Sequence, residues 1–241
     1  MTKFIAIGSL KGGVGKTTVA INLAAALSKV GSDVILVDAN LTTPNVSLHL
    51  GHPELNTIHD VITEKISLNE AIYKHTCGLR VMPSSIFLED INVNHFQKLS
   101  QVLNSLKGYA ETVIMDTVSG INEESINSYS LADEIIVVLE PNFPSTTEAL
   151  KLITLSKKLN IPIKGFVLNK IKDSRHELSK SAIESLLGEP LIGIIPEDEN
   201  MHRALAVQHP IVHSHPNSKS SYAFMKLAYN VASIPINNLI K

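Results

Sequence analysis

A glycine-rich loop between an apolar run and a helical pattern constrains this chain of 241 residues more than any other segment. The loop reads Ser-Leu-Lys-Gly-Gly-Val-Gly-Lys-Thr-Thr over residues 9–18 and follows the apolar run at 4–7. Glycine adopts backbone angles closed to other residues, so successive N–H groups can converge on a phosphate, and a helix N-terminus adds a favourable dipole. The order strand, loop, helix predicts a nucleotide-phosphate site. The alternative is a glycine-rich turn with two solvated lysines.

The backbone and two side chains of such a loop have distinct roles. Lys16 is expected to bridge the β- and γ-phosphates of a nucleoside triphosphate, and the Thr17 hydroxyl to ligate a magnesium ion. The residues expected to surround the phosphates are Gly12, Gly13, Val14, Gly15, Lys16, Thr17 and Thr18.

Short β-branched runs alternate with longer helical patterns along the whole chain. Continuous apolar runs such as 135–139 are typical of strands that helices cover on both faces. The pattern therefore predicts an α/β fold, a single doubly wound and mainly parallel sheet with helices on both faces, in one domain over 1–241. Predicted strands lie at 3–8, 34–38, 79–82, 112–116, 134–139, 163–169 and 191–195, and predicted helices at 16–29, 95–106, 145–159, 177–187, 201–206 and 218–232.

Composition narrows the function class. Cys77 is the only cysteine, which excludes a disulfide framework and a C-x-x-C metal pair. The net charge of −2 gives no general attraction to nucleic acid. His209, His213 and His215 have a spacing that could suit a metal. No cysteine or carboxylate is paired with them as a further ligand, so zinc is not expected. No signal-peptide pattern and no apolar stretch of about 18 residues occurs, which predicts a cytoplasmic protein.

Two predicted strands end on an aspartate. Asp38 follows Ile-Leu-Val, and Asp116 follows Val-Ile-Met. In a doubly wound sheet the chemistry lies at the carboxyl ends of strands, where a carboxylate can hold magnesium through a water. Both aspartates are therefore predicted to serve the magnesium ion with Thr17; the alternative is that each caps a following loop or helix.

The loop departs from the strict phosphate-loop pattern because Leu10 replaces the first glycine, and Lys11 precedes the double glycine. In this form it resembles the deviant Walker A loop, K-G-G-x-G-K-[ST], of the MinD/ParA family of ATPases, and over nearly the whole chain the resemblance is to archaeal MinD-like proteins. The resemblance implies an ATP-dependent homodimer in which Lys11 reaches the partner's ATP. We expect the Lys11 side chain to project away from its own loop.

Two further segments resemble the switch regions of that family. Residues 37–51 are similar to switch I, except that Asn40 replaces the second aspartate of D-x-D, which in the family positions the attacking water. An amide lacks the charge and basicity of a carboxylate. Nucleotide binding and dimerisation should therefore be retained, while ATP hydrolysis should be slow. Asp116 resembles the Walker B residue. The segment that follows it resembles switch II, whose Gly120 would offer an N–H to the γ-phosphate.

The last third of the chain resembles the adenine site of the family. Asn169, at the end of a predicted strand, would face adenine, and the Ile-Ile-Pro-Glu-Asp loop with Pro196 and Asp198 would close over the base. Considered without the neighbouring residues, Asn169 is equally well explained as a residue that caps a loop. The N-K-x-D pattern typical of guanine sites is absent, so ATP is favoured over GTP.

The resemblance implies a switch in spatial organisation, such as placement of the cell-division site, with an unidentified protein partner. Alternatives are a non-hydrolysing ATP-bound scaffold, a ParA-type partition ATPase and a metal-centre maturation ATPase. Nucleic acid is an unlikely partner, since the modest basic stretch over residues 157–180 is best explained as a set of lysine and arginine side chains exposed to solvent. The short tail with Leu239 and Ile240 carries too few cations for more than a weak membrane contact, peripheral and in the ATP state. The basic stretch comprises Lys157, Lys158, Lys164, Lys170, Lys172, Arg175 and Lys180.

Overall fold

The computed structural model describes residues 2–52, 56–90, 92 and 95–234. Within them, eight strands form one sheet in the order β3-β4-β2-β5-β1-β6-β7-β8. All pairings are parallel except that of the short edge strand β3 with β4. The strands are β1 (Lys3–Gly8), β2 (Val34–Asp38), β3 (Tyr73–Lys74), β4 (Arg80–Met82), β5 (Thr112–Asp116), β6 (Glu134–Leu139), β7 (Ile163–Ile171) and β8 (Leu191–Pro196).

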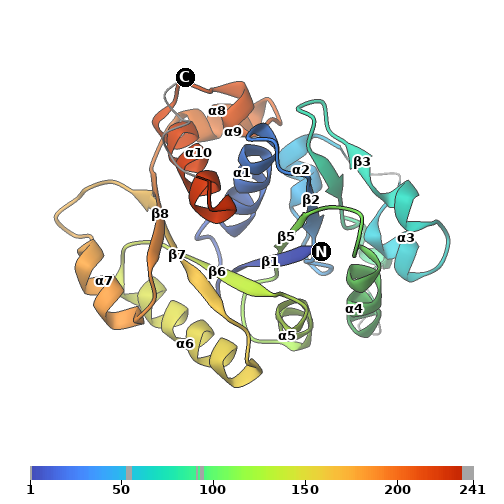
Figure 1. Cartoon of the computed structure of the whole chain (residues 1–241), viewed down its shortest axis with the longest axis horizontal. Helices are drawn as coiled ribbons and strands as arrows, with labels where there is room; N and C mark the ends of the chain where they lie inside the picture. Colours follow the sequence, from blue (N-terminus) through green and yellow to red (C-terminus); the bar gives the residue numbers. More distant parts are fainter. Residues whose placement is uncertain (1, 53–55, 91, 93–94, 235–241) are drawn as a thin grey trace.

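Helices cover both faces of the sheet, as Figure 1 shows. The described helices are α1 (Lys16–Lys29), α2 (Val46–Leu50), α3 (Ile58–Ile62), α4 (His95–Ser105), α5 (Glu123–Ser130), α6 (Phe143–Leu159), α7 (Lys180–Leu187), α8 (Asn200–Ala206), α9 (Ile211–Ser214) and α10 (Lys219–Ala232), with 3-10 turns η1 (Leu68–Ala71) and η2 (Leu88–Asp90).

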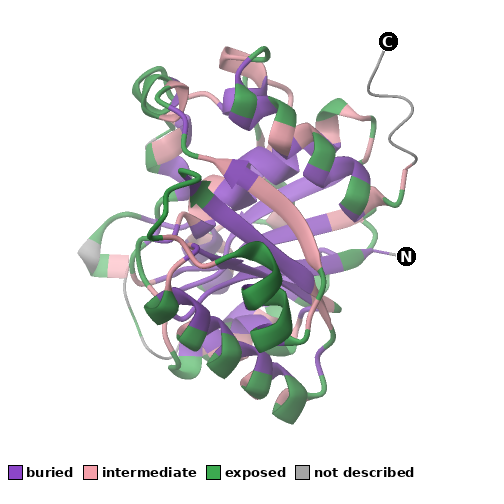
Figure 2. Ribbon diagram, turned by 90° about the vertical axis from the view of Figure 1, so that its left-hand side faces the viewer, coloured by how far each residue is buried: buried purple, intermediate pink, exposed green. Residues whose placement is uncertain are grey.

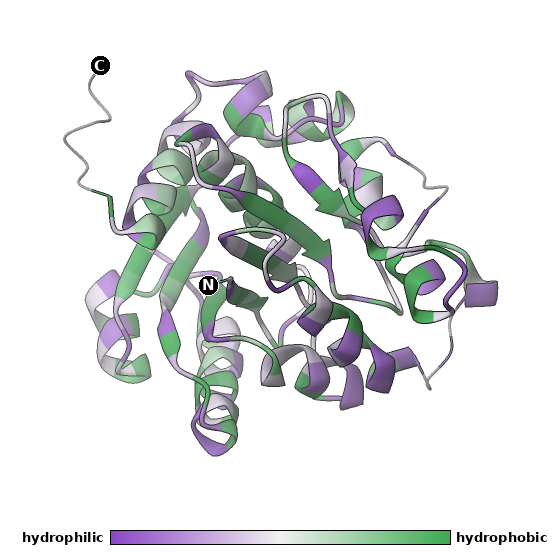
Figure 3. Ribbon diagram, turned by 45° about the vertical axis from the view of Figure 1, so that its right-hand side comes forward, coloured by the Kyte–Doolittle hydropathy of each residue, from purple (hydrophilic) through white to green (hydrophobic). Residues whose placement is uncertain are grey.

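The core consists of two apolar layers, one on each side of the sheet. Alternate side chains of β1 enter different layers: Ile5 and Ile7 pack with α1 and α10, whereas Phe4 and Ala6 pack on the opposite face. This alternation follows from the two-residue period of a strand. The central strands are buried along most of their length in Figure 2, whereas the edge strands β3 and β8 are mostly of intermediate burial or exposed. In Figure 3 the central strands are largely hydrophobic. The predicted doubly wound, mainly parallel sheet is confirmed.

The predicted long elements are present within a few residues of their expected ends, but several short ones were not predicted. These are β3, α2, α3, α5 and α9. Helix α5 carries few apolar residues, and its signal is a cap: the Asn122 side chain accepts a hydrogen bond from the backbone N–H of Ser125. The other four are shorter than two helical turns or, in β3, two residues long, too short for periodicity to identify.

No helix in the described part of the chain is long and apolar enough to span a membrane. The tail residues Leu239 and Ile240, for which a weak membrane contact was expected, lie outside the described residues.

Candidate functional site

The glycine-rich loop connects β1 to α1 at the carboxyl edge of the sheet, in the centre of the strand order. Gly13 and Gly15 have φ angles of +77° and +91°, in the left-handed region. At Gly15 a second constraint applies, because an added Cβ would lie 2.3 Å from Nδ2 of Asn169. That amide nitrogen donates a hydrogen bond to the Val14 carbonyl at 2.8 Å. Asn169, predicted at the base, therefore also holds the loop from the end of β7.

Lys16 begins α1 and points into the site rather than toward solvent. Its side-chain ammonium hydrogen-bonds Oγ of Ser119, and only 9% of the residue is exposed. Burial lowers the pKa of Lys16, while the nearby Asp116 carboxylate opposes that shift. A cation that is desolvated and only partly compensated would gain from an anionic ligand. Ser119 lies in the segment that resembles switch II, but its contact with Lys16 was not predicted.

Asp38 and Asp116 are direct neighbours in the register of β2 and β5. Both are buried, and burial is the main cause that raises the pKa of each, Asp116 to about 6 and Asp38 well above its ordinary range, where Asp116 adds to the shift. The Thr17 hydroxyl hydrogen-bonds Asp116, but Oδ1 of Asp116 has no hydrogen-bond partner. A buried carboxylate oxygen without a partner, beside a hydroxyl and a second carboxylate, fits a divalent cation with oxygen ligands.

Asp38 has its own hydrogen bonds, which differ from those of Asp116. Its Oδ1 accepts from the backbone N–H of Asn40 at 3.2 Å, and its Oδ2 from those of Asn45 and Val46 at 3.1 and 3.0 Å. Asp38 therefore shapes the loop 39–45 that follows β2. Any contact with a metal would come in addition to this role.

The Asn40 side chain lies in the same cleft as the glycine-rich loop. This cleft has a volume of about 440 Å³. Its walls come from loop 9–18, loop 39–45 and the segment after β5, and they include Gly13, Gly15, Lys16, Thr17, Thr18, Asn40, Thr43, Thr117 and Ser119. Gly120, expected to meet the γ-phosphate, is partly exposed with φ of +93° and is not among the cleft residues. In this structure Ser119 occupies the place beside Lys16.

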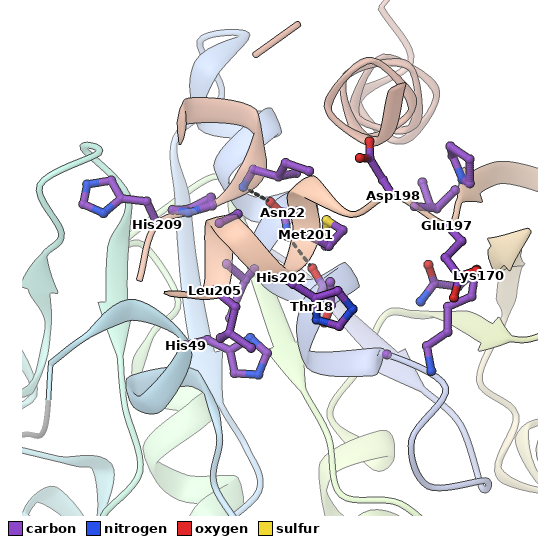
Figure 4. Close-up of a pocket in the computed structure, with 18 residues that line it drawn as sticks. Thr18, Asn22, His49, Lys170, Glu197, Asp198, Met201, His202, Leu205 and His209 are labelled. Atoms are coloured by element: carbon purple, nitrogen blue, oxygen red, sulfur yellow. Dashed lines mark hydrogen bonds between the residues drawn. The ribbon is translucent and has the colours of Figure 1, made fainter. Parts of the chain in front are cut away.

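A second, more apolar pocket adjoins the glycine-rich loop and shares Gly15 and Thr18 with the first cleft. Figure 4 shows Lys170, Glu197 and Asp198 at one side of it and His49, His202 and Leu205 at the other. Gly15, Thr18, Asn169 and Pro196 also line this pocket, so the residues predicted to surround the base do converge. The Asp198 carboxylate accepts from the backbone N–H groups of Asn200 and Ser220, both at 3.0 Å, and so connects α8 to α10.

Lys11 differs from its expected arrangement. Rather than projecting freely, its side-chain nitrogen lies 3.5 Å from Oε2 of Glu140 at the end of β6 in the same chain. Lys170 contacts the other oxygen of Glu140 at 2.8 Å and donates to the Gly13 carbonyl at 2.6 Å. Although burial alone raises it, hydrogen bonds from Lys170 and Asn142 hold the pKa of Glu140 below its ordinary range. Glu140 was not predicted as a site residue.

His209, His213 and His215, whose spacing could suit a metal, have other contacts in the structure. His209 contacts the Thr76 hydroxyl at 3.0 Å and stacks edge-on against His75. Across the part of the chain that the structure describes, no group of three or more histidine, cysteine, aspartate or glutamate side chains could hold a metal ion.

Comparisons with known proteins agree with this geometry. The CobQ/CobB/MinD/ParA nucleotide-binding domain matches residues 5–211. An uncharacterized ATP-binding protein of Methanocaldococcus jannaschii is 37% identical over 225 residues, which cover 93% of this chain and 85% of the relative.

Two solved archaeal structures are similar over nearly their full length. The septum site-determining protein MinD of Pyrococcus horikoshii, complexed with Mg-ADP, superposes with a TM-score of 0.90 at 34% identity and covers 96% of each chain. The cell division ATPase MinD of Pyrococcus furiosus gives a TM-score of 0.90 at 33% identity, covering 97% of this chain and 99% of that one.

Proposed function

This chain belongs to the CobQ/CobB/MinD/ParA family of nucleotide-binding proteins, and on that premise we propose that it is an ATPase acting as an ATP-dependent dimerisation switch. The observation that carries the proposal is the group formed by buried Lys16, Thr17 and the unpartnered oxygen of Asp116 beside the glycine-rich loop. The family match covers 5–211, and we propose that the whole chain, 1–241, is one domain of this type.

In this proposal the N–H groups of 12–16 and the Lys16 ammonium bind the nucleotide phosphates. Thr17, Asp116 and Asp38 would hold Mg²⁺. When bound, the ion neutralises phosphate charge. The buried carboxylate pair supports this assignment, since two adjacent carboxylates with raised pKa values are costly without a cation.

The base is proposed to occupy the apolar pocket between Asn169, Pro196 and α8. Apolar walls with a few fixed polar groups are typical of nucleobase and other small-ligand sites. Asn169 is anchored by Val14, so a base placed there would contact a residue that also holds the phosphate loop. ATP remains the proposed nucleotide.

Lys11 is proposed to exchange partners when the protein dimerises. In the single chain it is paired with Glu140 at 3.5 Å, and both side chains are partly exposed. Partly exposed ion pairs contribute only about 0–1 kcal/mol, so the contact is easily replaced by a stronger one with a phosphate. Glu140 would then keep Lys170 as its partner.

Hydrolysis is proposed to be slow because of Asn40. The amide is already engaged by Thr43 and carries no charge to polarise a water. The second candidate function, a non-hydrolysing ATP-bound scaffold, rests on this same observation. Release of phosphate from the purified protein under Mg-ATP separates the two: a rate indistinguishable from that of ATP in buffer favours the scaffold.

The cellular role is proposed to be spatial organisation, such as placement of the division site, through an unidentified protein partner. Partition on DNA is less well supported, since Lys164, Lys170 and Lys172 of the basic stretch pair with Glu134, Glu140 and Glu197. Metal-centre maturation would need ligands that a lone Cys77 does not supply.

The decisive experiment is light scattering of the 26.2 kDa chain in Mg-ADP and in Mg-ATP. We expect the mass to double only in ATP, and Lys11→Ala to abolish the doubling. Lys151→Ala, an exposed lysine on α6, is the matched control and should dimerise normally. An ATP-dependent dimer that persists in Lys11→Ala removes the crossing role of Lys11, and no dimer in the wild type removes the switch itself.

A further inference from the structure

Glu124 is a buried acidic residue that the proposed function does not use. It lies in the first turn of α5 and is only 2% exposed. Its Oε1 accepts hydrogen bonds from the backbone N–H of Leu41 and, at 3.2 Å, from that of Thr42. Its Oε2 accepts from the Thr42 hydroxyl at 2.6 Å. All three donors belong to loop 39–45.

The partners of Glu124 make it more than a local helix cap. A charged acceptor forms stronger hydrogen bonds than a neutral one, and a buried carboxylate that loses its donors is strongly unfavourable. Leu41 and Thr42 therefore cannot move away from α5 unless Glu124 moves with them or becomes hydrated. Ser128, one helical turn later, adds a second contact by donating from its hydroxyl to the Ala39 carbonyl at 3.4 Å.

The N-terminal end of α5 connects to the other half of the site. The segment 117–122 leads from β5 to α5, and within it Ser119 contacts Lys16. Thr117 fixes the start of this segment by donating to the Ile7 carbonyl at 2.7 Å. Segment 117–122 thus contacts Lys16 of the proposed phosphate site through Ser119, and the helix that follows it, α5, holds loop 39–45 through Glu124 in its first turn.

We propose that Glu124 is a positioning residue that transmits the nucleotide state from segment 117–122 to loop 39–45. This loop carries Asn40 and two of the three backbone N–H donors to Asp38. The proposal rests on the proposed function, because it takes nucleotide phosphates to be what segment 117–122 senses. A ligand that shifts Ser119 shifts the start of α5, and the buried carboxylate makes Leu41 and Thr42 follow.

The test is hydrogen–deuterium exchange of peptides covering 39–45 and 117–122, with and without a non-hydrolysable ATP analogue and Mg²⁺. In the wild type we expect the analogue to slow exchange in both segments. In Glu124→Ala we expect affinity for the analogue within about threefold of wild type, the change at 117–122 retained and the change at 39–45 lost. Glu124→Gln keeps one acceptor oxygen and should restore part of the response at 39–45.

Two further variants keep the test decisive. Glu123→Ala removes an exposed carboxylate from the same helical turn and should respond as wild type does. Thr42→Val removes one donor from the loop side and should weaken the response at 39–45 even if Glu124→Ala does not fold.

The possible failures can be told apart. A wild type that does not bind the analogue overturns the proposed function and the coupling with it. A wild type that binds it without a change at 39–45, or a Glu124→Ala and Thr42→Val pair that both retain the full change, overturns the coupling alone.

Discussion

Asn40 and Thr43 close a short loop on each other: Nδ2 of Asn40 donates to the Thr43 carbonyl at 2.7 Å, and the Thr43 N–H donates to Oδ1 of Asn40 at 2.8 Å. An aspartate could accept from the Thr43 N–H, but it has no donor for the Thr43 carbonyl and would place two oxygens against each other. The loop conformation in this structure is therefore one that an amide stabilises and a carboxylate does not.

Asn40→Asp is expected to have two opposite effects. Hydrolysis should rise by roughly tenfold or more, because a carboxylate orients and polarises a water better than an amide. The free energy of unfolding of the nucleotide-free protein should fall by about 1 kcal/mol, the usual net contribution of one hydrogen bond.

Two measurements test the effects of Asn40→Asp: phosphate release at saturating Mg-ATP for hydrolysis, and urea unfolding for stability. Thr43→Val, which retains the backbone partners, is the control. Equal hydrolysis rates in Asn40→Asp and wild type would make Asn40 a bystander.

Lys16→Ala is expected to lower the affinity for Mg-ATP by at least tenfold, about 1.4 kcal/mol. The reason is that Lys16 is a buried cation whose pKa burial lowers, so a phosphate in contact with it would regain much of the lost solvation. Titration calorimetry measures the change, with Lys151→Ala as the control. A loss of less than about threefold would show that the phosphates do not bind at Lys16.

Asp116 gives a pH dependence whose sign follows from its raised pKa of about 6. The raised pKa means that protonated Asp116 stabilises the folded state relative to the unfolded chain. This contribution to the free energy of unfolding is fully present below pH 3.8, the ordinary pKa, and is lost as pH rises through about 6. Without metal and nucleotide, Asp116→Asn should therefore stabilise the protein at pH 7.5, by on the order of 1–3 kcal/mol, and less at pH 5.5.

Urea unfolding at the two pH values tests this expectation, with the exposed Asp173→Asn as control. With Mg-ATP the order should reverse, because the wild-type carboxylate gains a cation that asparagine binds poorly. The same pH dependence in wild type and Asp116→Asn would contradict the assignment.

His75 should make the protein acid-sensitive. Burial, followed by the neighbouring His209, lowers its pKa; its Nδ1 accepts from the Cys77 N–H at 3.1 Å, and its Nε2 lies 3.2 Å from the Leu50 carbonyl. Because the pKa of His75 is lower in the folded than in the unfolded chain, neutral His75 contributes to the free energy of unfolding. This contribution is fully present above 6.5, the ordinary pKa, and is lost as pH falls below that value.

We therefore expect the wild type to lose more stability between pH 7.5 and 5.5 than His75→Gln does, measured by urea unfolding. The exposed His176→Gln should behave as wild type. An equal loss in His75→Gln and wild type would mean that other groups cause the acid sensitivity.

Local sequence patterns were enough to predict the fold class, and to predict that the glycine-rich loop, Asp38 and Asp116 lie at one edge of the sheet. The glycine-rich loop and the apolar runs ending on Asp38 and Asp116 are local patterns, and a parallel sheet necessarily brings the ends of its strands to one edge. Longer strands and helices followed from periodicity. Short elements such as α2 and α9 did not, since four or five residues are too few to show a period.

Which side chains hold those groups in place became visible only in the folded chain. Ser119 meets Lys16 across 103 residues of sequence, Glu124 meets Leu41 across 83, and Glu140 meets Lys11 across 129. No local pattern shows which partner each side chain meets, because Glu124 and Glu140 are ordinary polar residues in the sequence. The packing of helices on the sheet brings these partners together and buries Glu124 and Lys16. Burial then makes the choice of partner matter, since a charge removed from water must be compensated by whichever group the fold places beside it.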